Sequence, residues 1–129
     1  MRRIALIGLA IALTLIVIGS MASEAAKPEP MTLEGTSWYV FLLRIDLENH
    51  GVSYWITNFS FQDGLLNAEG LGTGPYVEQA SRIIVRWLAT IEQDELYWDF
   101  TGYAHSKGLV GIIDSNDGGF YIFFGMPEI

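Results

Sequence analysis

Residues 82–105, RIIVRWLATIEQDELYWDFTGYAH, decide the fold because they read as two strands folded back on each other. Apolar side chains recur at every second position in each half, so each predicted strand has one largely apolar face. A turn with an even number of residues, either Gln93-Asp94 or residues 92–95, keeps the two apolar faces together, whereas an odd turn would expose one of them. The predicted cross-strand pairs are Ile91–Leu96, Ala89–Trp98, Trp87–Phe100 and Val85–Gly102.

Three further strands are predicted before this hairpin, over residues 37–47, 52–62 and 65–73. Asp63-Gly64, which separates the second from the third, is among the strongest two-residue hairpin signals. Residues 76–81 are interpreted as a loop or a short irregular strand. In the third strand, Leu66, Ala68, Gly70 and Gly72 are expected to face Phe61, Phe59, Thr57 and Trp55.

Two more strands are predicted after the hairpin, because turn residues gather at 105–108 and again at 116–119. With both turns in place, one face stays apolar through four consecutive strands. The expected pairs are Ala104–Leu109, Gly102–Gly111, Phe100–Ile113, Ile113–Ile122 and Gly111–Phe124.

Seven to eight short strands joined by hairpin turns, with no helical periodicity after the N-terminal segment, predict an all-β protein. A meander with glycine kinks and a continuous aromatic inner face is most naturally closed into a small antiparallel up-and-down β-barrel, which removes the sheet edges. A two-layer β-sandwich is the alternative.

The first 22 residues differ in kind from the rest of the chain. Two arginines precede an uncharged run, and small residues follow it, which is typical of a secretory signal peptide cleaved after Ala22 or Ala26. The alternative is an uncleaved membrane anchor, because residues 4–22 are near the lower length limit for spanning a bilayer. Either way we expect the remainder to be exported, periplasmic or secreted, with contact to the membrane only through an uncleaved anchor.

Residues 23–34 are polar and contain two prolines, so they are expected to form a flexible linker to a barrel domain over residues 35–129. Without residues 1–22, five basic and fifteen acidic residues remain, for a net charge of −10. That charge argues against nucleic acid and anionic membranes as partners. The chain has no cysteine, so the domain must be held together by its core alone.

Two short segments resemble the start of calycin-type barrels, the lipocalins and avidin-like proteins. They are Gly35-Thr36-Ser37-Trp38-Tyr39, which opens the first strand, and residues 63–70, DGLLNAEG, at the second turn. The resemblance implies an exported antiparallel barrel that holds a small ligand at its mouth, with Trp38 at the place of the family's first-strand tryptophan. The chain departs from the family because G-x-W has become G-x-x-W and no C-terminal helix follows.

One set of candidate binding residues lies on the predicted inner face. Arg44 is expected to face Trp55 near one end, where a cation against an aromatic wall could orient an anionic or polar ligand. The competing interpretation is that the side chains of a small barrel fill its interior. The candidate ligand-binding residues are Trp38, Arg44, Trp55, Trp87, Trp98 and Phe100.

The other face of the first two strands is also apolar, and a single closed barrel would leave it in water. A patch of that size usually marks an interface. We expect self-association or a protein partner there. The candidate interface residues are Tyr39, Phe41, Leu43, Ile45, Val52, Tyr54 and Ile56.

Groups that could support catalysis or metal binding are present, but their spacing is unfavourable. Glu95 and Asp99 share the polar face of one strand with Arg86 diagonal to Asp99, which we interpret as a surface ion pair. His50 and His105 stand in different turns and are not expected to meet. We therefore predict no catalytic site, no metal site and no cofactor.

Two functions remain after these exclusions. The first is an exported barrel that binds an apolar or amphipathic small molecule. The second is an interaction protein with a solid barrel, whose outer patch on the first hairpin mediates self-association or partner binding.

Overall fold

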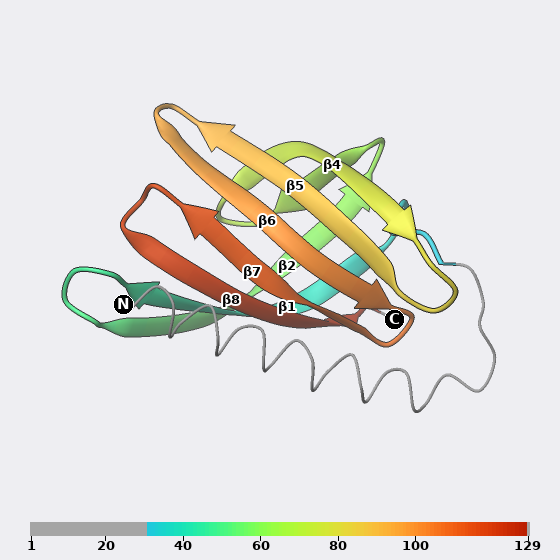
Figure 1. Ribbon diagram of the computed structural model, residues 1–129, viewed down its shortest axis with the longest axis horizontal. Helices are drawn as coiled ribbons and strands as arrows, with labels where there is room; N and C mark the ends of the chain where they lie inside the picture. The colour runs from blue at the N-terminus through green and yellow to red at the C-terminus, as the bar shows by residue number, and fades with distance from the viewer. Residues whose placement is uncertain (1–30, 129) are drawn as a thin grey trace.

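The computed structural model describes residues 31–128, which form eight antiparallel strands closed into one barrel (Figure 1). Each strand pairs with the next along the chain, and the last returns to pair with the first. The strands are β1 (Ser37–Asp46), β2 (Val52–Gln62), β3 (Leu65–Ala68), β4 (Gly72–Ala80), β5 (Val85–Gln93), β6 (Leu96–His105), β7 (Gly108–Ser115) and β8 (Gly119–Pro127).

The pairing of β8 with β1 confirms the predicted all-β up-and-down barrel over the two-layer sandwich. Nine residues of each strand are in register, from Trp38 opposite Pro127 to Asp46 opposite Gly119. Because this contact closes the sheet, neither the first nor the last strand is left with an unpaired edge.

The hairpin turn at Asp63-Gly64 confirms its sequence signal. Both residues have positive φ angles, 57° and 73°, as a two-residue type I′ turn requires. The turn sets Phe61 opposite Leu66 and Phe59 opposite Ala68, as expected.

The predicted third strand is wrong beyond Ala68. The chain turns there, with Gly70 and Gly72 at φ angles of 89° and 130°, and starts a separate strand. This strand includes residues 76–80 of the segment interpreted as a loop or a short irregular strand. Ala68 therefore pairs with Gly72, and β4 continues through Ala80. Glycine is the residue that adopts such positive φ angles without strain, so the two glycines mark a turn.

The predicted register of β5 and β6 is wrong by two residues, although the turn is even and the apolar faces coincide. The turn is Asp94-Glu95, with Asp94 at a φ of 58°, so Trp87 pairs with Gly102 and Ala89 with Phe100. A Cβ atom at Gly102 would lie 2.4 Å from Cε2 of Trp87. The indole thus packs directly on a residue without a side chain, which the predicted Trp87–Phe100 pair would not allow.

The predicted register of β7 and β8 is wrong by one residue, whereas that of β6 and β7 is confirmed, with Ala104 opposite Leu109. Ile113 pairs with Tyr121 instead of Ile122, because five residues, 115–119, connect the pair Asp114–Phe120. An odd connection exchanges the faces of a strand, so alternate residues of β8 point to the opposite side from that expected.

The core fills the inside of the barrel and extends to the segment before β1. Its largest fully buried side chains include Trp38, Trp87, Phe59, Phe61 and Phe100. Leu33 is also fully buried in this core, so packing begins ahead of residue 35. The predicted signal segment, residues 1–22, and residues 23–30 of the predicted linker lie outside the described residues.

Candidate functional site

Three of the six predicted ligand-binding residues, Trp38, Trp87 and Phe100, are fully buried in the core. Their neighbours are other rings of the same chain. Phe59 packs edge-on against Phe100 with ring centroids 5.7 Å apart, and Phe61 packs against Trp87 at 5.1 Å. The middle of the barrel is therefore occupied by the protein's own aromatic side chains.

Glycines allow these rings to lie flat against the barrel wall. A Cβ atom at Gly111 would lie 2.5 Å from the Phe123 ring, and a Cβ atom at Gly102 would lie 2.4 Å from the Trp87 indole. Phe123 in turn lies 5.3 Å from Phe59 and 5.7 Å from Trp87, centroid to centroid. The inner wall and the rings fit one another at van der Waals distance, as in a close-packed core.

One end of the barrel is closed by the segment that leads into β1. The backbone N–H of Leu33 donates to a carboxylate oxygen of Glu78 at 2.8 Å, and the Thr36 hydroxyl donates to the Leu33 carbonyl at 2.6 Å. The indole N–H of Trp38 donates to the same hydroxyl at 2.9 Å. Trp38 is therefore part of this closed end, far along β1 from Arg44.

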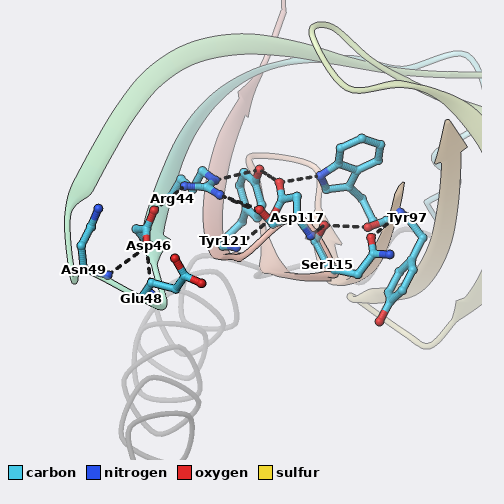
Figure 2. Close-up of polar contacts among 11 residues, drawn as sticks. Arg44, Asp46, Glu48, Asn49, Tyr97, Ser115, Asp117 and Tyr121 are labelled. Carbon is cyan, nitrogen blue, oxygen red and sulfur yellow. Dashed lines mark hydrogen bonds and ion pairs between the residues drawn. The ribbon is translucent and has the colours of Figure 1, made fainter. Parts of the chain in front are cut away.

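The opposite end carries a polar network around Arg44 (Figure 2). Its guanidinium donates to the Tyr121 hydroxyl at 3.2 Å and to the Asp117 backbone carbonyl at 3.1 Å, and lies 3.6 Å from the carboxylates of both Asp46 and Asp117. The guanidinium carbon also lies 5.8 Å from the centre of the Tyr121 ring. Arg44 is thus bound by groups of its own chain on several sides.

Asp117 is the second centre of this network. Its carboxylate accepts hydrogen bonds from the Tyr121 hydroxyl, from the indole N–H of Trp98 at 3.2 Å and from the backbone N–H of Gly119 at 2.8 Å. Burial acts to raise the pKa of Asp117, but these hydrogen bonds and the charge of Arg44 outweigh it and lower the pKa below its ordinary value. The carboxylate is therefore ionised and stabilises the β7–β8 turn in which it lies.

The predicted pairing of Arg44 with Trp55 is wrong by two residues. Leu42 lies opposite Trp55, and Arg44 lies opposite Ser53. Trp55 is partly buried and packs edge-on against Tyr121 at 6.4 Å. The structure therefore brings together Arg44, Trp55 and Trp98 around Tyr121 and Asp117, two residues that the sequence analysis did not select.

A different feature covers the outside of β8, β1 and β2. The pairings of β1 with β2 and β8 define four rows of three outward-facing residues, with β1 in the middle. Eleven of the twelve are hydrophobic, the exception is Asn58, and none is charged. We call this set the outer apolar face: Met126, Tyr39 and Asn58; Phe124, Phe41 and Ile56; Ile122, Leu43 and Tyr54; and Phe120, Ile45 and Val52.

Half of the twelve positions are exposed, whereas Phe120 and Ile122 are buried at 7% and 6% exposure and pack with Leu43 and Ile45. The aromatic ring of Phe41 stacks on Tyr54 at 5.6 Å and packs against Phe124 at 5.2 Å, so the side chains form one layer across three strands. Six of them expose more than half of their surface: Tyr39 53%, Val52 61%, Tyr54 69%, Ile56 75%, Phe124 52% and Met126 65%.

The sequence analysis selected the hydrophobic β1 and β2 members of the outer apolar face but missed Asn58 and all of its β8 members. It placed Phe124 inside, opposite Gly111, because of the one-residue error in the β7–β8 register. Residues 120–124, FYIFF, are apolar at every position, so alternation alone cannot show which of them point outward.

Within the described part of the chain, the charged residues outside the Arg44 network do not form a second site. Asp99 lies opposite Thr90 and accepts its hydroxyl hydrogen bond at 3.0 Å, whereas Arg86 lies opposite Tyr103, so the predicted diagonal between Arg86 and Asp99 is wrong. Among residues 31–128, no group of three His, Asp or Glu side chains is arranged to hold a metal ion. The same part of the chain contains no helix long and apolar enough to cross a membrane.

Compared with models of known protein families and with curated proteins, the chain finds no match.

Proposed function

We propose that this protein is an exported interaction module, in which a solid β-barrel presents the outer apolar face to a protein partner or to another copy. The observation that carries the proposal is the composition of that face, with eleven hydrophobic side chains among twelve neighbouring positions. Strands that are apolar on both faces are normally covered on both faces. Contiguous exposed apolar surface of this kind marks an interaction site in soluble proteins.

The interior supports this proposal over a small-molecule binder. Trp38, Trp87 and Phe100, which would have lined a ligand cavity, are in contact with other core side chains. Arg44, which would have oriented an anionic ligand, is bound to Tyr121, Asp117 and Asp46. A ligand would have to displace these intramolecular contacts, whereas a partner at the six most exposed side chains of the outer apolar face would displace water.

The proposal also includes the export of this protein and its relationship to calycin-type barrels. Residues 1–22 support export, because they combine a basic start, an apolar run and small residues before the cleavage positions. An eight-stranded up-and-down barrel with a tryptophan at the start of its first strand is compatible with a calycin-like relationship. If the chain has that relationship, it would bind its partner through the outside of the barrel and not hold a ligand at the barrel mouth.

Site-specific cross-linking in the host tests the proposal. A photo-reactive benzoylphenylalanine in place of Tyr54 is expected to give a covalent adduct with a protein, because this side chain is 69% exposed within the outer apolar face. Tyr97, which is exposed on β6, provides the matched control, for which we expect no adduct. Absence of an adduct from position 54 and from position 39 would contradict the proposal.

A further inference from the structure

The outer apolar face points to a specific occupant, and we propose that it is the same face of a second copy of this chain. The inference depends on the proposed function, since it names the partner for the interaction surface. A contact between identical faces is isologous and closes as a two-fold dimer, the commonest arrangement among soluble oligomers. Three features of the outer apolar face favour a two-fold dimer: its exposed area, its lack of charge and its shape.

The exposed area matches what a dimer needs. The six most exposed side chains of the face contribute roughly 100 Å² each, and together about 600 Å², given the 150–250 Å² that a large aromatic side chain can bury. The part-exposed Phe41, Leu43 and Ile45 add to this. A stable interface of standard size buries about 800 Å² on each partner, so this single face supplies most of one half.

The distribution of charge selects against other ways of self-association. The whole chain carries a net charge of −8, and the β5–β6 hairpin carries exposed Glu92, Glu95 and Asp99 against a single exposed arginine, Arg86. Two copies that met through that side would bring carboxylates against carboxylates, which is unfavourable. The outer apolar face has no charged side chain, so two copies can approach through it without like-charge repulsion.

The same absence of charge bears on the identity of the partner. A binding partner that recognised this acidic protein electrostatically would need acidic side chains within the contact surface, and the face provides none. Its polar groups are the Tyr39 and Tyr54 hydroxyls and the Asn58 amide, which can both donate and accept hydrogen bonds and so can pair with their own kind.

The shape of the face suits sheet-on-sheet packing. Its twelve positions cover three adjacent strands with β1 in the middle, and β8, β1 and β2 lie side by side along one side of the barrel (Figure 1). Two such sheets can pack face to face about 10 Å apart, with their side chains interdigitated as in a β-sandwich. The dimer would then bury the outer apolar face between two barrels that are each already closed.

Native mass spectrometry and sedimentation of protein purified from its own host provide the test. The wild-type protein is expected at twice the mass of the processed chain. Ile56→Glu places a charge at the most exposed position of the face and is expected to raise the dissociation constant at least about 100-fold, because the charge would be buried without a partner. Val77→Glu is the matched control, since Val77 is 65% exposed on β4 outside the face, and it is expected to remain dimeric.

Thermal unfolding of each variant shows whether it is folded, and Ile56→Thr serves as a milder variant if Ile56→Glu is not. A wild-type monomer at about 100 µM would overturn the inference, because interfaces of this size bind at micromolar concentration or more tightly. A dimer that Ile56→Glu does not weaken would overturn it as well. A monomer that retains residues 1–22 would overturn it in favour of that segment or a membrane as the occupant.

The cross-linking experiment distinguishes the two proposals. An adduct from position 54 with twice the mass of the chain supports both the interaction function and the second copy. An adduct with a different protein, from a chain that is monomeric, refutes the second copy and supports the interaction function. A monomer without any adduct refutes both.

Discussion

Hairpins β1–β2 and β5–β6 each turn one face into the barrel, where both contribute tryptophan and phenylalanine to the same core. Trp38 and Phe59 from the first hairpin are as fully buried as Trp87 and Phe100 from the second. On the outside they differ. The β5–β6 hairpin presents Arg86, Glu92 and Asp99 to water beside the exposed Leu88 and Tyr97, whereas the outward face of β1–β2 presents only uncharged residues, mostly tyrosine, valine and isoleucine.

This difference shows that closing the barrel does not require an apolar outer face. The β5–β6 hairpin contributes fully to the core with an exterior that is polar or charged except at Leu88, Leu96 and Tyr97, so core formation alone does not account for the continuous apolar exterior of β1–β2. The six side chains of the outer apolar face that are more than half exposed gain little from folding, because they remain in contact with water. Association is the process that would bury them.

The largest expected effect concerns the core, to which both hairpins contribute fully buried aromatic rings. Phe59→Ala on β2 and Phe100→Ala on β6 should each lower the free energy of unfolding by about 3–5 kcal/mol, because each removes a fully buried ring and leaves a cavity. Urea unfolding measures both. The two rings touch, so the double variant should lose less than the sum of the single losses. If either variant lowers the free energy of unfolding by less than about 1 kcal/mol, the barrel interior is not closely packed around these rings.

The next effect concerns the polar end of the barrel, where β1 meets β8. Asp117→Asn should lower the free energy of unfolding at pH 7 by about 1.5–3 kcal/mol, the usual contribution of hydrogen bonds to a charged group. The pKa of Asp117 is lowered in the folded protein, so its ionised form contributes stability at pH values above about 3.9, the ordinary pKa of aspartate.

That contribution is lost as the pH falls from about 3.9 through the lowered pKa of the folded state. The difference between wild type and Asp117→Asn should therefore shrink over this acidic range. Urea unfolding of both proteins at several pH values between neutral and acidic measures it. A difference that stays constant into acid would show that the Asp117 carboxylate is not the stabilising group.

The smallest effect on the stability of one subunit concerns the outer surface of the barrel, where Ile56 on β2 lies within the outer apolar face and Val77 on β4 lies outside it. Ile56→Thr and Val77→Thr should each change the free energy of unfolding of the monomer by less than about 0.5 kcal/mol, because both side chains are already mostly exposed. The wild-type melting temperature should nevertheless rise with protein concentration, since association stabilises the folded state. Ile56→Thr should weaken that dependence and Val77→Thr should preserve it; equal behaviour of the two variants would remove the distinction between the faces.

The fold could be predicted largely from local patterns. Alternation identified most of the strands, and Asp63-Gly64 identified one turn by the φ angles that its residues adopt readily. The sequence pattern also placed the β1 and β2 members of the outer apolar face on one side. What it could not supply was the register of β1–β2, β5–β6 and β7–β8, because several apolar pairings satisfy the same alternation.

The candidate site shows the same limit. Arg44 was selected as a cation near an aromatic wall, but its partners Tyr121 and Asp117 lie 77 and 73 residues away along the chain. Their meeting depends on the closure of β8 against β1, for which the sequence contains no local signal. Phe124 was placed inside for a related reason, since the five-residue connection at 115–119 exchanges the faces of β8.

The amino-acid sequence by itself determined that the domain consists of β-strands and that β1 and β2 are apolar on both faces. These properties follow from periodicity and composition, which are local. Only the tertiary structure decided which residues of β8 point outward, how far the outer apolar face extends and that Arg44 has partners within the chain. Those properties follow from packing Trp87 and Phe123 against Gly102 and Gly111 and from closing the barrel, which depend on contacts between distant parts of the chain.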